Sequence, residues 1–121
     1  MSELEETFWL YNSRYFHFGK KKLETLLGVE WANLDKDKAL GVNRSYRVFY
    51  APKGQPKTDK FKILINQTYK KVGTIWMTTL LHEMVHFKLQ GLDPSRLSCG
   101  SRMFDREMKK LANEGAFHRL W

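Results

Sequence analysis

The chain has 121 residues, 42% of them hydrophobic and 14% aromatic, which is enough for one domain with a real core and too apolar for general disorder. Its 21 lysines and arginines exceed its 13 acidic residues to give a net charge of +8, which suits acidic partners such as nucleic acid as well as a plain solvated surface. One cysteine excludes an internal disulfide and a four-cysteine zinc site, and no membrane-spanning apolar run or basic signal-peptide start is present, so we expect an intracellular protein, in cytoplasm, nucleoid or nucleus.

The first predicted element is a helix over about residues 3–16. Ser2 and Glu5 have the spacing of a capping box, which marks a helix start. Apolar residues then recur at three- and four-residue steps along one stripe, at Leu4, Phe8, Tyr11 and Tyr15. Gly19 is expected to end this helical region.

Three segments with strand character follow. Residues 29–32 form a short candidate strand, and residues 33–41 are typical of a polar turn. Residues 46–50 alternate in a β-rich run that ends at a stretch rich in proline and glycine. Residues 61–65 are the strongest strand candidate, with Asn66 as its end. We therefore expect a small sheet of about three strands.

Two helices complete the prediction. Residues 74–90 are densely apolar and free of proline, which predicts a long helix closed by Gly91. Residues 101–113 predict a last helix with Met103 or Phe104, Met108 and Leu111 facing inward. No repeat or linker is found, so residues 1–121 are expected to form one α+β domain.

The long predicted helix carries the motif His82-Glu83-Met84-Val85-His86. On a helix, His82 and His86 lie about 40° apart around the axis and about 6 Å apart along it, so both imidazoles can reach one metal ion. Glu83 is displaced by about 60° from His86, beside the metal rather than on it, as a general base for hydrolysis requires. This arrangement predicts a zinc site. The opposite arc of the helix is expected to be core, at Met77, Leu80, Leu81, Met84 and Val85.

The threonines one turn earlier are candidates for a supporting role. Thr78 and Thr79 flank the ligand face and could hydrogen-bond a ligand imidazole. Threonines inside helices more often bond backward to the main chain, so this alternative is kept beside the first.

A catalytic zinc requires a third protein ligand and an open position. Leu89 and Leu92 stand where the extended metzincin motif would need glycine and histidine, which excludes that motif. Cys99 precedes a predicted helix start that favours a thiolate, and Glu107 has the spacing of a helix-borne glutamate ligand. Each also has an interpretation without a metal: most lone cysteines are inert buried thiols, and a helix glutamate near Arg106, Lys109 and Lys110 is more usually a solvated surface residue. The candidates are Cys99, Asp105, Glu107, Glu114 and His118.

The sequence resembles the SprT-like metallopeptidases, the group that includes Spartan. The specific part is TLLHEMVH at residues 79–86. More general likeness extends over most of the chain, in FWLYNSRYF at residues 8–16, VEW at residues 29–31 and ILIN at residues 63–66.

This resemblance implies a zincin-like minimal protease domain with a Zn²⁺ cofactor. It implies that His82, His86 and the residue at position 99 hold the zinc, with Glu83 as base. The family has histidine followed by glycine where this chain has Cys99-Gly100. A thiolate is a sound zinc ligand, but its extra negative charge is expected to weaken the metal as a Lewis acid.

Family members act on proteins bound or crosslinked to DNA, so the resemblance implies an endopeptidase with a protein substrate and a role in DNA–protein crosslink repair. Two other functions are kept as alternatives: a zinc-stabilised DNA-binding module with little or no hydrolysis, and a dedicated peptidase that cuts one protein without DNA. DNA, with single-stranded DNA as one candidate, would meet one lysine triplet and two lysine pairs: Lys20, Lys21, Lys22, Lys70, Lys71, Lys109 and Lys110.

Overall fold

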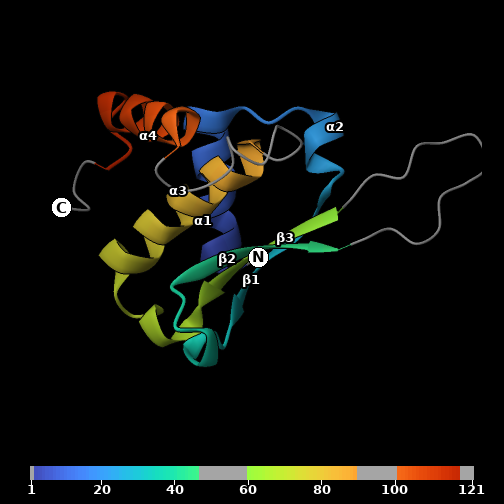
Figure 1. Cartoon of the computed structure of the whole chain (residues 1–121), viewed down its shortest axis with the longest axis vertical. Helices are drawn as coiled ribbons and strands as arrows, with labels where there is room; N and C mark the ends of the chain where they lie inside the picture. The colour runs from blue at the N-terminus through green and yellow to red at the C-terminus, as the bar shows by residue number, and fades with distance from the viewer. Residues whose placement is uncertain (1, 47–59, 90–100, 118–121) are drawn as a thin grey trace, which may run out of the picture.

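The computed structural model describes residues 2–46, 60–89 and 101–117. Within this part the architecture is mixed α+β, as predicted, with helices packed on a three-stranded sheet (Figure 1). The α-helices in these ranges are α1 Glu3–Tyr11, α2 Lys20–Leu23, α3 Gly73–Leu89 and α4 Arg102–Asn113.

The N-terminal helical region begins and ends as predicted, at Glu3 and Phe16, but only its first part, α1, is an α-helix. The Ser2 hydroxyl accepts a hydrogen bond from the backbone N–H of Glu5 at 3.2 Å, which caps α1. After Tyr11 the chain continues through one π-helical turn, Asn12–Phe16, and leaves the helix at His17, whose φ of 54° is left-handed. Gly19 therefore does not end this helix. It precedes the short helix α2, which the sequence analysis did not anticipate.

The sheet has the order β1-β3-β2. Strand β1, Leu26–Ala32, runs parallel to β3, Lys60–Asn66, while β2, Gly41–Tyr46, runs antiparallel to β3. The central position of β3 agrees with its strong apolar pattern, because a strand paired on both sides is the most buried. The strand predicted over residues 46–50 begins earlier, at Gly41, and residues 47–50 lie outside the described residues.

A cluster of polar side chains connects the end of β3 to the turn between β1 and β2 through hydrogen bonds. Asn66 is 2% exposed, and its amide nitrogen donates to Asp35 Oδ1 at 2.9 Å and to the carbonyl oxygen of Ala39 at 3.0 Å. Its amide oxygen accepts from the backbone N–H of Thr68 at 3.1 Å, and the Thr68 hydroxyl donates to Asp35. These bonds fix the approach to β2.

Helix α3 lies at the centre of the molecule. It packs on the sheet beside α1, and α4 packs on α3 (Figure 1). It matches the predicted helix over residues 74–90 within one residue at each end, and Gln90 and Gly91 lie outside the described residues. The predicted core arc is confirmed. Four of its five residues are completely buried, namely Leu80, Leu81, Met84 and Val85, and the fifth, Met77, packs against the core.

The last helix also follows the prediction. The Ser101 hydroxyl caps α4 by accepting from the backbone N–H of Phe104 at 3.2 Å. Phe104 and Leu111, each 4% exposed, face inward, with Met103 and Met108 partly buried beside them. No helix in the described ranges is long and apolar enough to cross a membrane.

Candidate metal centre

The two motif histidines converge on one face of α3, as their spacing predicts. Their Nε2 atoms lie 3.2 Å apart and their ring centroids 4.8 Å apart. Two nitrogens bound to a tetrahedral zinc at about 2.0–2.1 Å lie about 3.3 Å from each other. The observed separation therefore fits two corners of a zinc site.

The protonation of His82 also suits a metal. Burial, with a smaller contribution from the neighbouring His86, lowers the pKa of His82. A lowered pKa favours the neutral imidazole, which is the form that binds a cation.

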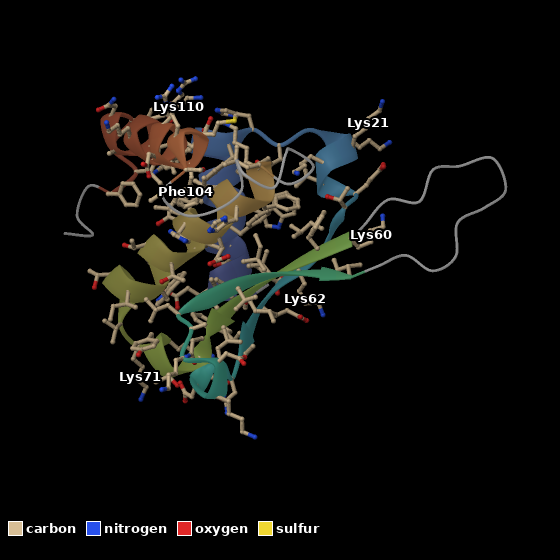
Figure 2. The ribbon with its side chains drawn as sticks, in the orientation of Figure 1. Lys21, Lys60, Lys62, Lys71, Phe104 and Lys110 are labelled. Carbon is tan, nitrogen blue, oxygen red and sulfur yellow. The ribbon has the colours of Figure 1, made fainter. Side chains whose placement is uncertain are left out.

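Phe104 of α4 packs against both imidazoles. Its ring centroid lies 4.8 Å from that of His82 and 4.6 Å from that of His86, and the side chain is almost completely buried. Figure 2 shows it beneath α4, on the side of α3. An ion pair of 2.7 Å between Lys88 and Glu107 also joins the two helices. The position of α4 therefore restrains the orientation of the imidazole rings.

Glu83 follows His82 directly on α3 and is buried. It is 6% exposed, and burial raises the pKa of its carboxyl group to about 7. A carboxyl group with a pKa near neutrality can accept a proton and return it at physiological pH. The place of Glu83 on the helix and the chemistry of its carboxyl group are those expected of a general base.

The two neighbouring threonines behave differently. The Thr79 hydroxyl donates back to the Ile75 carbonyl oxygen at 2.7 Å, which is the ordinary behaviour of a helical threonine. Thr78 Oγ1 is buried and has no hydrogen-bond partner. This unpaired hydroxyl lies one turn before His82 and remains available to hydrogen-bond a group bound at the site.

The candidates for a third ligand do not gather around the imidazoles in the described part of the chain. No group of three metal-binding side chains is found among residues 2–46, 60–89 and 101–117. Glu107 is paired with Lys88, and Asp105 and Glu114 line a groove on the outer face of α4. Cys99 and His118 lie outside the described residues.

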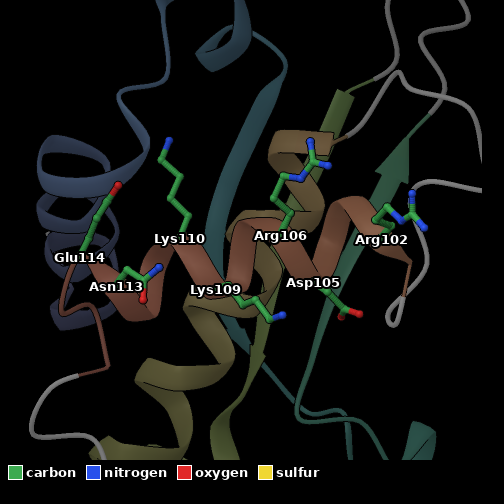
Figure 3. A pocket seen from close by; sticks show the side chains of 7 residues that line it. All are labelled: Arg102, Asp105, Arg106, Lys109, Lys110, Asn113 and Glu114. Carbon is green, nitrogen blue, oxygen red and sulfur yellow. The ribbon is translucent and has the colours of Figure 1, made fainter.

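The groove on α4 is open and strongly charged. It has a volume of about 870 Å³, and Figure 3 shows its side chains along successive turns of the helix. Four of its residues are basic and two are acidic, and all are exposed. They are Arg102, Asp105, Arg106, Lys109, Lys110, Asn113 and Glu114.

Two neighbours of the site were missed by the sequence analysis. Phe104 was expected to face inward, but its contact with the imidazoles was not foreseen. Gly41, at the start of β2, lies against Thr79 and Glu83. Both contacts join segments far apart in the chain, and no local pattern indicates them.

Comparisons of the chain with protein-family models, with curated proteins and with solved structures found no match. What the centre can do is therefore inferred from its residues.

Proposed function

We propose that the chain is a zinc-dependent endopeptidase of the SprT-like type, acting on DNA-associated proteins. The observation that carries this proposal is the imidazole pair of His82 and His86, with Nε2 atoms 3.2 Å apart, next to the buried Glu83 on the same helix. This donor set and spacing fit zinc, and the adjacent carboxylate supplies the base that hydrolysis needs.

The chain's own residues divide the work. His82 and His86 would hold zinc, which when bound supplies Lewis acidity toward a peptide carbonyl and toward water. Glu83 would take a proton from the attacking water and deliver it to the leaving amine. Phe104 packs on both imidazoles and would keep them oriented. Burial of the Glu83 carboxylate limits the access of bulk water to it.

Cys99 is proposed as the third ligand on the strength of the family resemblance. Replacing it by serine and by alanine should lower zinc affinity in both variants. Undiminished affinity in both would transfer the role to His118 or to Glu107, and Glu107 would then have to leave Lys88.

The catalytic role of Glu83 is tested by Glu83→Gln. Cleavage of a DNA-binding protein should fall by about 10²- to 10⁴-fold while one zinc per chain is retained. Glu30→Gln, the same change at an exposed position on β1, is the matched control and should cleave normally. Cleavage by Glu83→Gln at the control rate would overturn the mechanism.

A second function, nucleic-acid binding with little hydrolysis, is favoured by the charged groove on α4. Its four basic side chains lie along one helix face, where they can meet successive phosphates. Cleavage that depends on single-stranded DNA supports the DNA-directed peptidase, cleavage indifferent to DNA supports a dedicated peptidase, and binding without cleavage supports the DNA-binding module.

The role of the groove is tested by a matched pair of double variants. Arg106→Gln/Lys110→Gln removes two charges from the groove, and Lys36→Gln/Lys38→Gln removes two at the opposite end of the molecule (Figure 1). For a single-stranded oligonucleotide, the groove variant should reduce the slope of log affinity against log salt by about 1.4. Equal slopes in the two variants would remove the groove from nucleic-acid binding.

A further inference from the structure

The first residue of β2 meets α3 at the catalytic carboxylate. A Cβ atom built on Gly41 would lie 2.6 Å from Thr79 Cγ2, 3.1 Å from Glu83 Cγ and 3.2 Å from the Leu64 carbonyl oxygen. Carbon atoms in ordinary contact are about 3.5–4.0 Å apart. Glycine at this position therefore allows a close approach of β2 to α3 that no other residue allows without a shift.

The contacts of this position lie on two different elements. Gly41 pairs with Ile65 on β3, and the Leu64 carbonyl oxygen belongs to the same strand, so the sheet bounds one side. Helix α3 bounds the other through Thr79 and Glu83. The crowding caused by an added methyl group therefore cannot be relieved by moving β2 alone.

The two neighbours on α3 differ in their freedom to move. Thr79 is 8% exposed, and its hydroxyl is bonded to the Ile75 carbonyl oxygen at 2.7 Å. Rotating its methyl group away would break that bond, and a β-branched side chain in a helix has few rotamers. The unbranched Glu83 side chain is the easier one to displace. Crowding at position 41 is therefore transmitted to Glu83.

We propose that Gly41 is a positioning residue for Glu83: the bare backbone at the start of β2 seats the Glu83 side chain beside the imidazole pair. The effect on hydrolysis rests on the proposed function, while the effect on the place of the carboxylate does not. Two glycines earlier in the chain have no such contacts. A Cβ on Gly19 would meet nothing within 4 Å, and one on Gly28 would meet only the Glu30 side chain, at 3.8 Å.

The test uses three variants of the full chain: Gly41→Ala, Thr79→Ser and the two combined, with Gly19→Ala as control. Thr79→Ser removes the methyl group that the new Cβ would strike at 2.6 Å and keeps the hydroxyl bond to Ile75. In the double variant the 3.1 Å contact with Glu83 remains. Packing strain and displacement of Glu83 are thereby separated.

Two readouts are needed, one of which is independent of hydrolysis. In the zinc-loaded protein, Gly41→Ala should lower kcat several-fold, with a smaller change in KM. The loss should stay below the roughly 10²-fold that a misplacement of about 1 Å can cause, because the 3.1 Å contact displaces Glu83 by less than that. In the zinc-free protein, the ¹³C resonance of the Glu83 carboxyl group, assigned with Glu83→Gln, should shift in Gly41→Ala and stay in place in Gly19→Ala.

The double variant decides between positioning and packing. We expect its melting temperature to recover most of the way to that of Thr79→Ser, because the 2.6 Å contact is relieved, while kcat stays low and the Glu83 resonance stays shifted. Recovery of kcat and of the resonance together with stability would overturn the proposal.

Two further outcomes are kept apart. If the wild-type chain hydrolyses nothing, the proposed function fails, and the Glu83 resonance still tests Gly41. If the alanine variants do not fold, the wild-type protein decides: a nuclear Overhauser effect between the Gly41 α-protons and the Glu83 γ-protons supports the proposal, and its absence overturns it.

Discussion

Glu83 and Asp35 are two carboxylates that the fold treats in opposite ways. Burial raises the pKa of Glu83 to about 7, so folding opposes its ionisation. Asp35 is exposed, and hydrogen bonds from Asn66 and then Thr68 lower its pKa, so folding favours its ionisation. The Asp35 cluster stabilises the fold, whereas Glu83 is kept where its charge costs stability. A cost of that kind is typical of a group placed for chemistry.

Removing the centre of the structural cluster should have the largest effect. Asn66→Ala deletes three hydrogen bonds, two to Asp35 and Ala39 and one from Thr68, at a net loss of about 1 kcal/mol each. The free energy of unfolding should fall by about 3 kcal/mol in urea titrations. Asn113→Ala, on the exposed face of α4, is the control and should change it by less than about 0.5 kcal/mol. Equal losses would show that the cluster is not what stabilises this end of the sheet.

Removing the charge of Glu83 should have the opposite effect and raise the free energy of unfolding. In the zinc-free protein the folded state holds the Glu83 proton up to about pH 7, while the unfolded chain releases it near 4.5. The free energy of unfolding therefore falls as pH rises between these values, and Glu83→Gln removes that fall. At pH 8 the variant should be more stable than wild type by up to about 3 kcal/mol in chelator-treated samples, at about 1.4 kcal/mol for each pKa unit.

The control for this prediction is Glu30→Gln, which removes an exposed carboxylate and should leave the pH profile in place. A zinc-free Glu83→Gln protein less stable than wild type at pH 8 would contradict the contrast between the two carboxylates.

The smallest effect is expected at Asp35, and in acid. Its lowered pKa contributes stability that is fully present above the unfolded value of 3.8 and is lost as pH falls through the folded value. Asp35→Asn has no such charge to lose. Its melting temperature should therefore decline less than that of wild type between about pH 4 and pH 2. Asp37→Asn, on the same turn, is the matched control, and parallel profiles for wild type and Asp35→Asn would refute the assignment.

Much of the fold could be predicted because its signals are local. The Ser2 and Ser101 caps, the apolar spacing of α1 and α4 and the dense apolar run of α3 each lie within one segment. Helix α2 was missed because its lysine triplet has no apolar stripe. The start of β2 was missed because Gly41 resembles a turn residue, although it is there for close packing.

The site divides in the same way. His82, Glu83 and His86 could be placed in advance because their geometry is a property of one helix. The contacts of Phe104 and Gly41 depend on how α4 and β2 pack against α3, and single-sequence patterns carry no such information. Cys99 as third ligand stays a prediction, since it lies outside the described residues.

The central claim is that His82 and His86 bind one metal ion together. X-ray absorption at the zinc edge, on the full chain with one equivalent of zinc, tests it most directly. We expect at least two nitrogen neighbours at about 2.0–2.1 Å, with a shell that loses nitrogen in His82→Ala and in His86→Ala and is unchanged in His17→Ala. Failure to take up zinc, or the same shell in all three variants, would contradict the account.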